Sequence, residues 1–585
     1  MRRHRHCGSD ANKKPITQRL NLTSSPSHFP LPMRLQQILG PLILLATAMA
    51  TPIVDLGYAR YQGMVNTDTN VTTFLGIRYA AAPMNGLRFH APTPPTPVTD
   101  LQQAIEQPAQ CYQDPSTGTS PTNPLRRRQV SNVSSEDCLF LRYTYIMFVL
   151  REISNNGLRS VYYPSDAVGV PVGGLPTLIY IHGGGYFLGS SSQFRGTDLI
   201  AQSNRGVVVV IVQYRLGLFG FLAGNKVKKN GALNAGLLDQ EFALRWVNKH
   251  ISKFGGDPSK VVVWGESAGA GSVLQQIVAN GGQTKPQLFR GAITSSTYLP
   301  SQYNYNDPIP EFLYNEVVSQ ANCTNATDSM ACLRATDVQI LATANQDISA
   351  GAFFGTVLWT PVVDGEFIQQ RPTLSLAQGK VNGEALLSVT NAFEGTIFVN
   401  QTAATSSNAT QFAFELFPQF SSTDASRVGS LYAGLGAQPF QSNAILGESI
   451  LICPTYFLLR AFAGRAFKGE FAIPPGFHGA DIEYYFPSVL IDVPEIPTQP
   501  LYNNTAFIDA FAQSFISFAI SLDPNVKVDP QSLTPEWNKW DKERRTEMVF
   551  NKTEADIPHI MPAKTSEALL ERCRFWESVG GITGQ

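Results

Sequence analysis

The sequence lacks an excess of charge of either sign. Its 585 residues include 44 Lys and Arg against 45 Asp and Glu, which gives a formal net charge of −1 at pH 7. It also lacks a P-loop, a dinucleotide-binding glycine fingerprint, an HExxH zinc motif and a CxxC pair. The neutral balance gives no electrostatic argument for binding nucleic acid or an anionic membrane surface. The missing motifs predict a protein without a cofactor or a metal.

Long apolar runs are also lacking, and no stretch after residue 50 is expected to span a bilayer. Residues 1–32 are basic and rich in Pro and Ser, whereas residues 33–50 combine a charged start, a short apolar run and a small-x-small cleavage site. The second pattern is typical of a secretory signal peptide. We therefore predict that translation starts at Met33 and that 1–32 is upstream sequence, with 51–585 as the mature domain. A signal anchor with a cytoplasmic tail is the alternative.

Cysteines and glycosylation acceptors follow the predicted signal peptide. The cysteines are Cys111, Cys138, Cys323, Cys332, Cys453 and Cys573. The acceptors of the form N-x-S/T are Asn70, Asn132, Asn322, Asn325, Asn400, Asn408, Asn503 and Asn551. The short loop 323–332 and the polar loop 111–138 are natural disulfide closures, while Cys453 and Cys573 either pair or stay buried and free. Together these features predict a secreted, oxidised and glycosylated extracellular protein.

The most informative stretch is residues 261–272. Three valines and a tryptophan predict a buried strand, a GESAG sequence follows at 265–269, and a helix-compatible run begins at Ser272. In a strand–turn–helix context, G-x-S-x-G forces its serine, here Ser267, into a strained conformation that exposes the hydroxyl at the edge of a sheet. Glycines flank the serine because a side chain there would collide with the neighbouring strand or helix. The alternative is a chance turn of Gly and Ser.

Other segments place this turn in an α/β domain. Residues 177–181 predict a strand that runs into His182 and three glycines, whose bare N–H groups can approach a bound group closely. A further apolar strand is predicted at 207–214 and a helix at 237–251. Strands that alternate with helices favour a mostly parallel sheet covered on both faces.

Residues 57–63 and 71–77 predict a small N-terminal hairpin or meander. Loop 111–138 has the composition of a surface flap.

The motifs together resemble the type-B carboxylesterases, a family of α/β-hydrolases that includes secreted fungal esterases and lipases. The matching segments are FLGIRYA at 74–80, EDCL at 136–139, HGGG at 182–185, QYRLG at 213–217, NAGLLDQ at 234–240, FGGDP at 254–258 and GESAGA at 265–270. The resemblance covers nearly all of the mature chain. It implies an α/β-hydrolase fold and a Ser–Glu–His triad.

By this resemblance Ser267 is the nucleophile, Glu394 the acid and His478 the base. It also implies an oxyanion hole made of the backbone N–H groups of Gly184, Gly185 and Ala268. The residues alone say less. His478 lies on a loop after a proline-rich stretch and is free to aim at a site, but Glu394 by itself is unremarkable, because most glutamates are solvated.

The expected activity is hydrolysis of small-molecule or lipid esters through an acyl-enzyme. A non-catalytic adhesion homologue is disfavoured because Ser267, Glu394 and His478 are all present. A choline esterase is disfavoured because loop 111–138 has no Trp to bind a cation and has three Arg. A lipase or sterol esterase with loop 111–138 as its lid remains open, although the low apolar content of that loop favours a general carboxylesterase.

One segment departs from the family pattern. Residues 143–160 intervene where the family continues directly into a strand resembling 161–164, and removing them restores a plain alternating strand. We interpret them as a translated intron or another gene-model error. A true loop insertion is the alternative, and it could disturb a strand of the sheet.

Overall fold

The buried apolar runs form an eleven-stranded sheet in the computed structural model, which describes residues 51–66, 70–114, 134–146, 173–489 and 500–585. The strand order is β14-β13-β12-β11-β10-β9-β7-β8-β6-β4-β3. The strands are β3 (Met64–Asn66), β4 (Val71–Arg78), β6 (Phe140–Ile146), β7 (Leu175–Ile181), β8 (Val208–Val212), β9 (Gly256–Glu266), β10 (Gly291–Ser295), β11 (Ala385–Asn391), β12 (Ala466–Phe471), β13 (Thr546–Lys552) and β14 (Pro558–Lys564). The predicted signal peptide and upstream segment lie outside the described residues.

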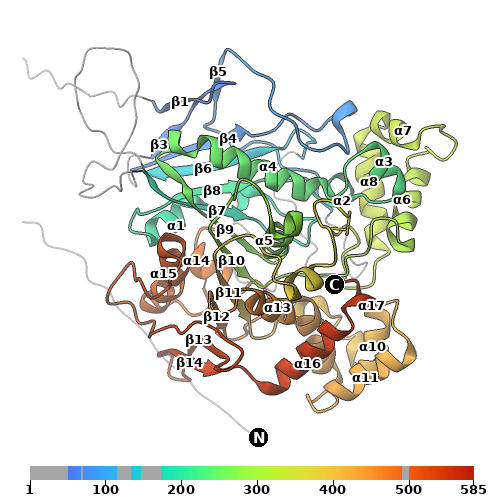
Figure 1. Cartoon of the computed structure of the whole chain (residues 1–585), viewed down its shortest axis with the longest axis vertical. Coiled ribbons are helices and arrows are strands. Elements are labelled where there is room, and N and C mark those ends of the chain that lie inside the picture. The colour runs from blue at the N-terminus through green and yellow to red at the C-terminus, as the bar shows by residue number, and fades with distance from the viewer. Residues whose placement is uncertain (1–50, 67–69, 115–133, 147–172, 490–499) are drawn as a thin grey trace, which may run out of the picture. The chain divides into compact units, whose positions relative to one another are not determined.

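The centre of this sheet is parallel and its edges are antiparallel. Every neighbouring pair from β8 across to β13 is parallel. The pairs β13–β14, β8–β6, β6–β4 and β4–β3 are antiparallel. Parallel strands need crossover connections, which place helices on the faces of the sheet. The predicted α/β-hydrolase fold with a mostly parallel central sheet is confirmed (Figure 1).

Both faces of the sheet are covered, so the central strands are apolar on both sides. On β7, Ile179 and Ile181 belong to one buried cluster, whereas Leu178 and Tyr180 belong to a second cluster on the opposite face. This alternation follows from the two-residue period of a strand. It also explains why the central strands were recognisable as continuous apolar runs.

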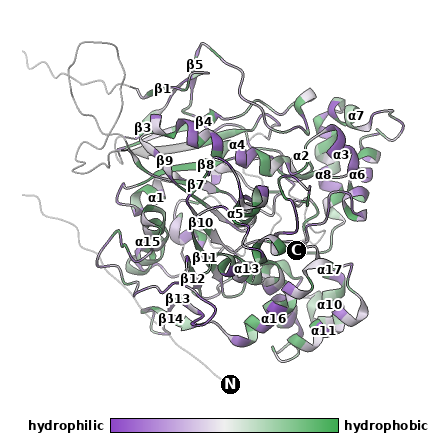
Figure 2. Cartoon of the chain, viewed as in Figure 1, coloured by the Kyte–Doolittle hydropathy of each residue, from purple (hydrophilic) through white to green (hydrophobic). Residues whose placement is uncertain are grey.

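Four helices show how the two layers are built (Figure 1). They are α1 (Gly196–Gln202), α4 (Ala235–His250), α5 (Ala268–Val278) and α15 (Thr505–Ser521). Helices α4 and α5 pack in the first cluster and α1 and α15 in the second. Outer helices such as α4 and α16 (Glu567–Ser578) carry both hydrophilic and hydrophobic residues, as expected for helices with one buried face (Figure 2).

The N-terminal β structure is divided between two sheets. Strand β2 (Arg60–Gln62) lies in a separate three-stranded sheet with β1 (Ile53–Asp55) and β5 (Leu101–Gln103). Strand β4 instead forms an antiparallel pair with β3 at the edge of the large sheet.

The unusual segment 143–160 begins inside strand β6. Its first four residues continue that strand, with Tyr143 opposite Phe74 of β4 and Val210 of β8. The strand is therefore not interrupted at residue 143, in keeping with the β-branched and aromatic character of these residues. Residues 147–160 lie outside the described residues, and the gene-model interpretation stays a prediction.

Three disulfides join the six cysteines that follow residue 50. Cys111 pairs with Cys138 and Cys323 with Cys332, across sequence separations of 27 and 9. The third links Cys453 to Cys573 across 120 residues. It ties α16 to α13 (Cys453–Ala461), a long-range closure that the sequence left open.

One long apolar stretch was not recognised from the sequence. The continuous helical run Gln438–Ala461 is long and apolar enough to cross a membrane by length and composition. However, 78% of its most apolar window is buried inside the molecule, as in the core helix of a globular protein.

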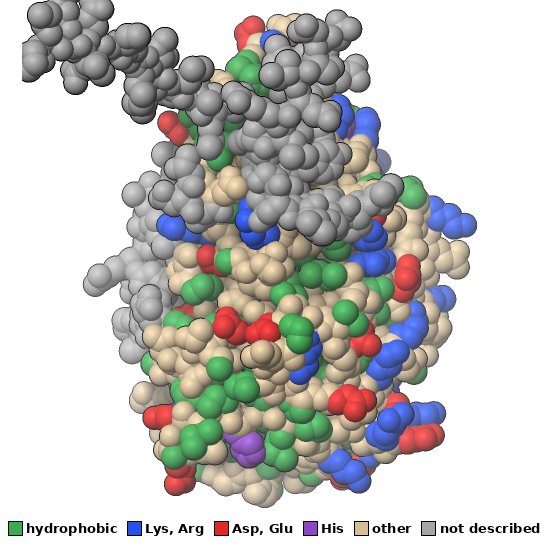
Figure 3. Space-filling model, turned by 90° about the vertical axis from the view of Figure 1, so that its left-hand side faces the viewer, with side chains coloured by type: hydrophobic (Ala, Val, Ile, Leu, Met, Phe, Trp, Pro, Cys, Tyr) green, Lys and Arg blue, Asp and Glu red, His purple; other side chains and the backbone are tan. Residues whose placement is uncertain are grey.

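On the face seen in Figure 3, acidic and basic side chains are interspersed, as the near-zero net charge leads one to expect.

Candidate active site

Ser267 lies on a sharp turn between strand β9 and helix α5. Its φ of 56° and ψ of −125° place it outside the regions that non-glycine residues ordinarily occupy. The turn is held in place because the Ser267 N–H donates to the carbonyl of Ser295 at 2.9 Å and the Gly271 N–H donates to the Ser267 carbonyl at 2.8 Å. The sequence pattern thus corresponds to a strained serine at the carboxyl end of a central strand.

Glycines make this turn possible. A Cβ added at Gly265 would collide with the backbone of Gly269, and one added at Gly269 would collide with the carbonyl oxygen of Ile181 on β7. The close approach of strand and helix therefore excludes any side chain at either position. This is the collision anticipated from the GESAG sequence.

The structure brings Ser267, His478 and Glu394 together. The Ser267 Oγ lies 2.8 Å from His478 Nε2, and His478 Nδ1 lies 2.6 Å from Glu394 Oε2. The three side chains come from the segments that follow β9, β12 and β11, because the carboxyl ends of parallel strands meet at one edge of a sheet. All three residues are buried, with Glu394 only 1% exposed.

Two further donors orient the carboxylate of Glu394. Its Oε1 accepts the backbone N–H of Asn391 at 2.6 Å and the hydroxyl of Ser296 at 2.7 Å. This leaves Oε2 for the Nδ1–H of His478, so the neutral imidazole presents an unprotonated Nε2 to Ser267. Sequence reasoning missed Ser296 and Asn391, because no motif marks them.

The environment of His478 favours its protonated form. Burial lowers the pKa of the imidazole, but the hydrogen bond and the negative charge of Glu394 outweigh burial, and the pKa is raised above 6.5. An imidazolium formed when Ser267 gives up its proton would thus be stabilised.

The predicted oxyanion donors lie around the same pocket. Gly184 and Gly185 follow β7 with φ values of 101° and 62°, conformations that favour glycine. Both line the pocket that contains Ser267 and His478, and Ala268 begins α5 next to the serine. Within the described part of the chain, the backbone N–H groups of these three residues donate to no protein acceptor.

Two buried carboxyl groups beside the imidazole were also missed. Glu266 Oε1 lies 3.5 Å from His478 Nε2, and burial raises the pKa of Glu266 from 4.5 to about 8. Burial likewise raises the pKa of Asp481 to about 6, although the carboxylate accepts hydrogen bonds from Asn391 and Tyr485. Glu266 occupies a variable position of G-x-S-x-G, so the motif gave no signal for it.

The pKa of Glu266 predicts how replacing it changes stability with pH. Between pH 4.5 and about 8 the folded protein holds a proton that the unfolded chain has lost. The contribution of Glu266 to stability therefore falls as the pH rises through that window. Because glutamine does not titrate, the melting temperature of Glu266→Gln, relative to wild type, should increase from pH 5 to pH 8.5.

The matched control is Glu554→Gln, because Glu554 is exposed on the turn between β13 and β14. Its melting temperature should follow that of the wild type at every pH. Parallel curves for wild type and Glu266→Gln would contradict the assigned burial effect.

The pocket over the serine is small and apolar. It has a volume of about 80 Å³ and includes Ser267, His478, the glycine loop and apolar side chains. The ring of Phe398 meets the His478 ring edge-on at 4.9 Å between centroids. Such walls exclude water and strengthen electrostatic interactions at the reacting atoms.

The mostly parallel sheet and the serine on its strand–helix turn define an α/β-hydrolase. The chain belongs to the carboxylesterase family, whose model matches residues 50–428. It is a carboxylic ester hydrolase. The family match includes Ser267 and Glu394 and ends before His478.

Individual relatives agree with this assignment. The carboxylesterase patB of Aspergillus clavatus is 28% identical over 92% of this chain and 98% of its own length. The secreted lipase 1 of Botryotinia fuckeliana is 31% identical over 61% of this chain and 60% of its own. The crystal structure of Aspergillus niger EstA is 30% identical, with a TM-score of 0.77 over 92% of this chain and 99% of its own.

Proposed function

We propose that the protein hydrolyses esters through a covalent acyl-enzyme on Ser267. The observation that carries this proposal is the continuous chain of hydrogen bonds from Ser267 through His478 to Glu394, at 2.8 and 2.6 Å. Serine alone is a weak nucleophile at neutral pH and needs a base within hydrogen-bond reach. His478 is so placed, and Glu394 holds it in the required tautomer.

The reaction then has two halves. In the first, Ser267 Oγ attacks the ester carbonyl while His478 takes its proton, and the imidazolium gives that proton to the departing alcohol. In the second, His478 takes a proton from water, the resulting hydroxide attacks the acyl carbon, and the proton returns to Ser267 as the acid leaves. The oxyanion of each tetrahedral intermediate accepts hydrogen bonds from Gly184, Gly185 and Ala268. Each donor of this kind contributes on the order of a hundredfold or more in rate.

A p-nitrophenyl phosphonate tests this mechanism directly. The activated serine attacks its phosphorus and displaces p-nitrophenolate, and the resulting phosphonylated serine mimics the tetrahedral intermediate. We expect one p-nitrophenolate released per protein, and mass spectrometry should find the adduct on the peptide that contains Ser267. The variant Ser267→Ala should form no adduct at that peptide. An adduct on another residue in the wild type would contradict the assignment.

A general carboxylesterase is preferred over a lipase. The reason is the low apolar content of loop 111–138, of which residues 115–133 lie outside the described residues. Relatives named as secreted lipases keep lipid esters as the second candidate.

We also propose that the protein is secreted and glycosylated. Secreted relatives and three disulfides support an extracellular location. The acceptor asparagines within the described residues are all exposed or half-buried; they are Asn70, Asn322, Asn325, Asn400, Asn408, Asn503 and Asn551. None of these asparagines is fully buried, which supports their use as glycosylation acceptors.

A further inference from the structure

A second and larger cavity adjoins the pocket over Ser267. It has a volume of about 530 Å³, compared with about 80 Å³ for the pocket at the serine. Four residues line both spaces: Tyr298, Gly355, Val357 and Ile450. The larger cavity falls within the range of roughly 300–1,000 Å³ typical of sites for small molecules, and the smaller one does not. We call the larger cavity the annex. It is large enough to hold most of a substrate whose ester group lies at Ser267.

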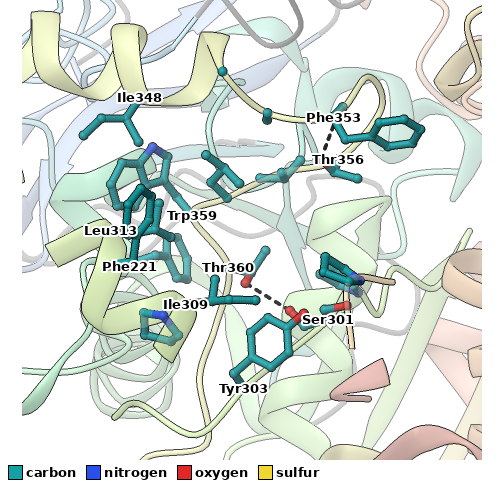
Figure 4. Close-up of a pocket in the computed structure, with 18 of the residues that line it drawn as sticks. Phe221, Ser301, Tyr303, Ile309, Leu313, Ile348, Phe353, Thr356, Trp359 and Thr360 are labelled. Atoms are coloured by element: carbon teal, nitrogen blue, oxygen red, sulfur yellow. Dashed lines mark hydrogen bonds between the residues drawn. The ribbon is translucent and has the colours of Figure 1, made fainter. Parts of the chain in front are cut away.

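The annex is walled by aromatic and aliphatic side chains. It lies between helices α6 (Pro308–Gln320) and α8 (Val338–Ala350) and the segment 351–360. Figure 4 shows Ile348, Trp359 and Leu313 together along one wall. Phe353 and Thr356 lie at the opposite side of this view. Moving an apolar group from water onto a surface of this kind lowers the free energy of binding.

Val357 is the residue that narrows the junction between the two spaces. Its Cγ2 would lie 3.2 Å from a Cβ on Gly185, so it stands directly against the glycine loop. Gly355 is less suitable, because a Cβ there would collide with the carbonyl of Phe398, whose ring contacts His478. A larger side chain at Val357 would fill the passage between the annex and Ser267.

The charged side chains that line the annex are all acidic. Among the described residues that line it are Glu316, Asp347 and Glu415, and none of these lining residues is Lys, Arg or His. Carboxylates and aromatic faces both attract cations, whereas a second negative charge is repelled. The annex is thus suited to an apolar group that is uncharged or cationic.

We propose that the annex binds the long apolar part of the ester substrate and selects neutral or cationic groups over anionic ones. This inference rests on the proposed reaction at Ser267 and names the substrate class for that site. Esters with an apolar chain of about eight carbons or more, without a distal carboxylate, are the class that fills both spaces.

The first test is a series of p-nitrophenyl esters from acetate to dodecanoate, measured as kcat/KM. Burying one methylene is worth roughly fourfold, so wild type should gain at least about tenfold between butyrate and octanoate. Ile309→Trp, which narrows the annex and does not line the serine pocket, should lose this gain and keep acetate hydrolysis within about twofold. The variant Val357→Trp, which narrows the junction of the two spaces, should also lose the longest esters. A parallel series of acetate esters of longer alcohols tells whether the annex takes the acyl or the alcohol chain.

The matched control is Val526→Trp, because Val526 is 58% exposed and lines neither cavity. Its chain-length profile should equal that of the wild type. An unchanged profile in Ile309→Trp, in both series and with acetate hydrolysis intact, would overturn the annex and leave the reaction at Ser267 standing. Failure of the reaction itself would instead appear as acetate hydrolysis that persists in Ser267→Ala.

Charge selection is tested with octanoate esters that end in a carboxylate or in a trimethylammonium group. Wild type should prefer the cationic ester roughly fivefold or more at low salt, and the preference should shrink as salt screens the charges. In the triple variant Glu316→Gln, Asp347→Asn and Glu415→Gln the preference should approach one. A preference that persists in the triple variant would overturn the role of these carboxylates.

Discussion

Replacing Ser267 with alanine is expected to lower kcat for p-nitrophenyl acetate roughly a millionfold, the size of loss seen when a serine hydrolase loses its nucleophile. The reason is that Ser267 Oγ is the atom held 2.8 Å from His478 Nε2 on a turn that exposes it to the pocket. The alanine methyl group keeps the packing but cannot form the acyl-enzyme. The measurement is the rate of p-nitrophenolate release by purified variant and wild type at equal concentration.

Ser319→Ala is a suitable control, because Ser319 is exposed on α6 away from the site. It should keep the wild-type rate. Melting temperatures of both variants should show that the fold is retained. Turnover by Ser267→Ala within tenfold of wild type would remove this serine from the reaction.

Replacing Glu394 with glutamine is expected to lower kcat by about ten-thousandfold, as the corresponding change of the acid does in serine proteases. The glutamine oxygen would keep the hydrogen bonds from Asn391 and Ser296, which turns its NH₂ group towards His478 Nδ1. Nδ1 must then accept a hydrogen bond, so the imidazole proton moves to Nε2. An Nε2 that carries a proton cannot take one from Ser267.

The kinetic signature separates this effect from loss of structure. KM should stay within a few-fold of wild type while kcat falls, because substrate binding does not use Glu394. The conservative variant Glu394→Asp should recover part of the activity, since a carboxylate again faces Nδ1. Equal activity in Glu394→Gln and wild type would contradict the role of the acid.

The turn around Ser267 could be predicted from sequence because its residue pattern is local. Gly265 and Gly269 lie within five residues of each other, and a Cβ at Gly265 would meet the backbone of Gly269, although a Cβ at Gly269 would meet the distant strand β7 at Ile181. Glu394 and His478 are different. They are 84 residues apart, and His478 lies 211 residues from Ser267. Only the resemblance to a family connected them.

Features that depend on packing alone escaped prediction. Ser296 reaches Glu394 because β10 lies between β9 and β11, an order that no sequence pattern states. The pairing of Cys453 with Cys573 likewise depends on how α16 packs against α13. The helical run Gln438–Ala461 was not recognised as one long apolar element, because three shorter helical segments join there without a break.

The origin of the site in three separate crossovers has a practical consequence. The nucleophile, acid and base meet only when β9, β11 and β12 are assembled around β10. A fragment that ends before His478 cannot contain the complete group, and a partly refolded chain cannot align it. Ester turnover is therefore a sensitive reporter of correct refolding, and it can monitor the recovery of this protein during production more directly than any spectroscopic signal from a single helix.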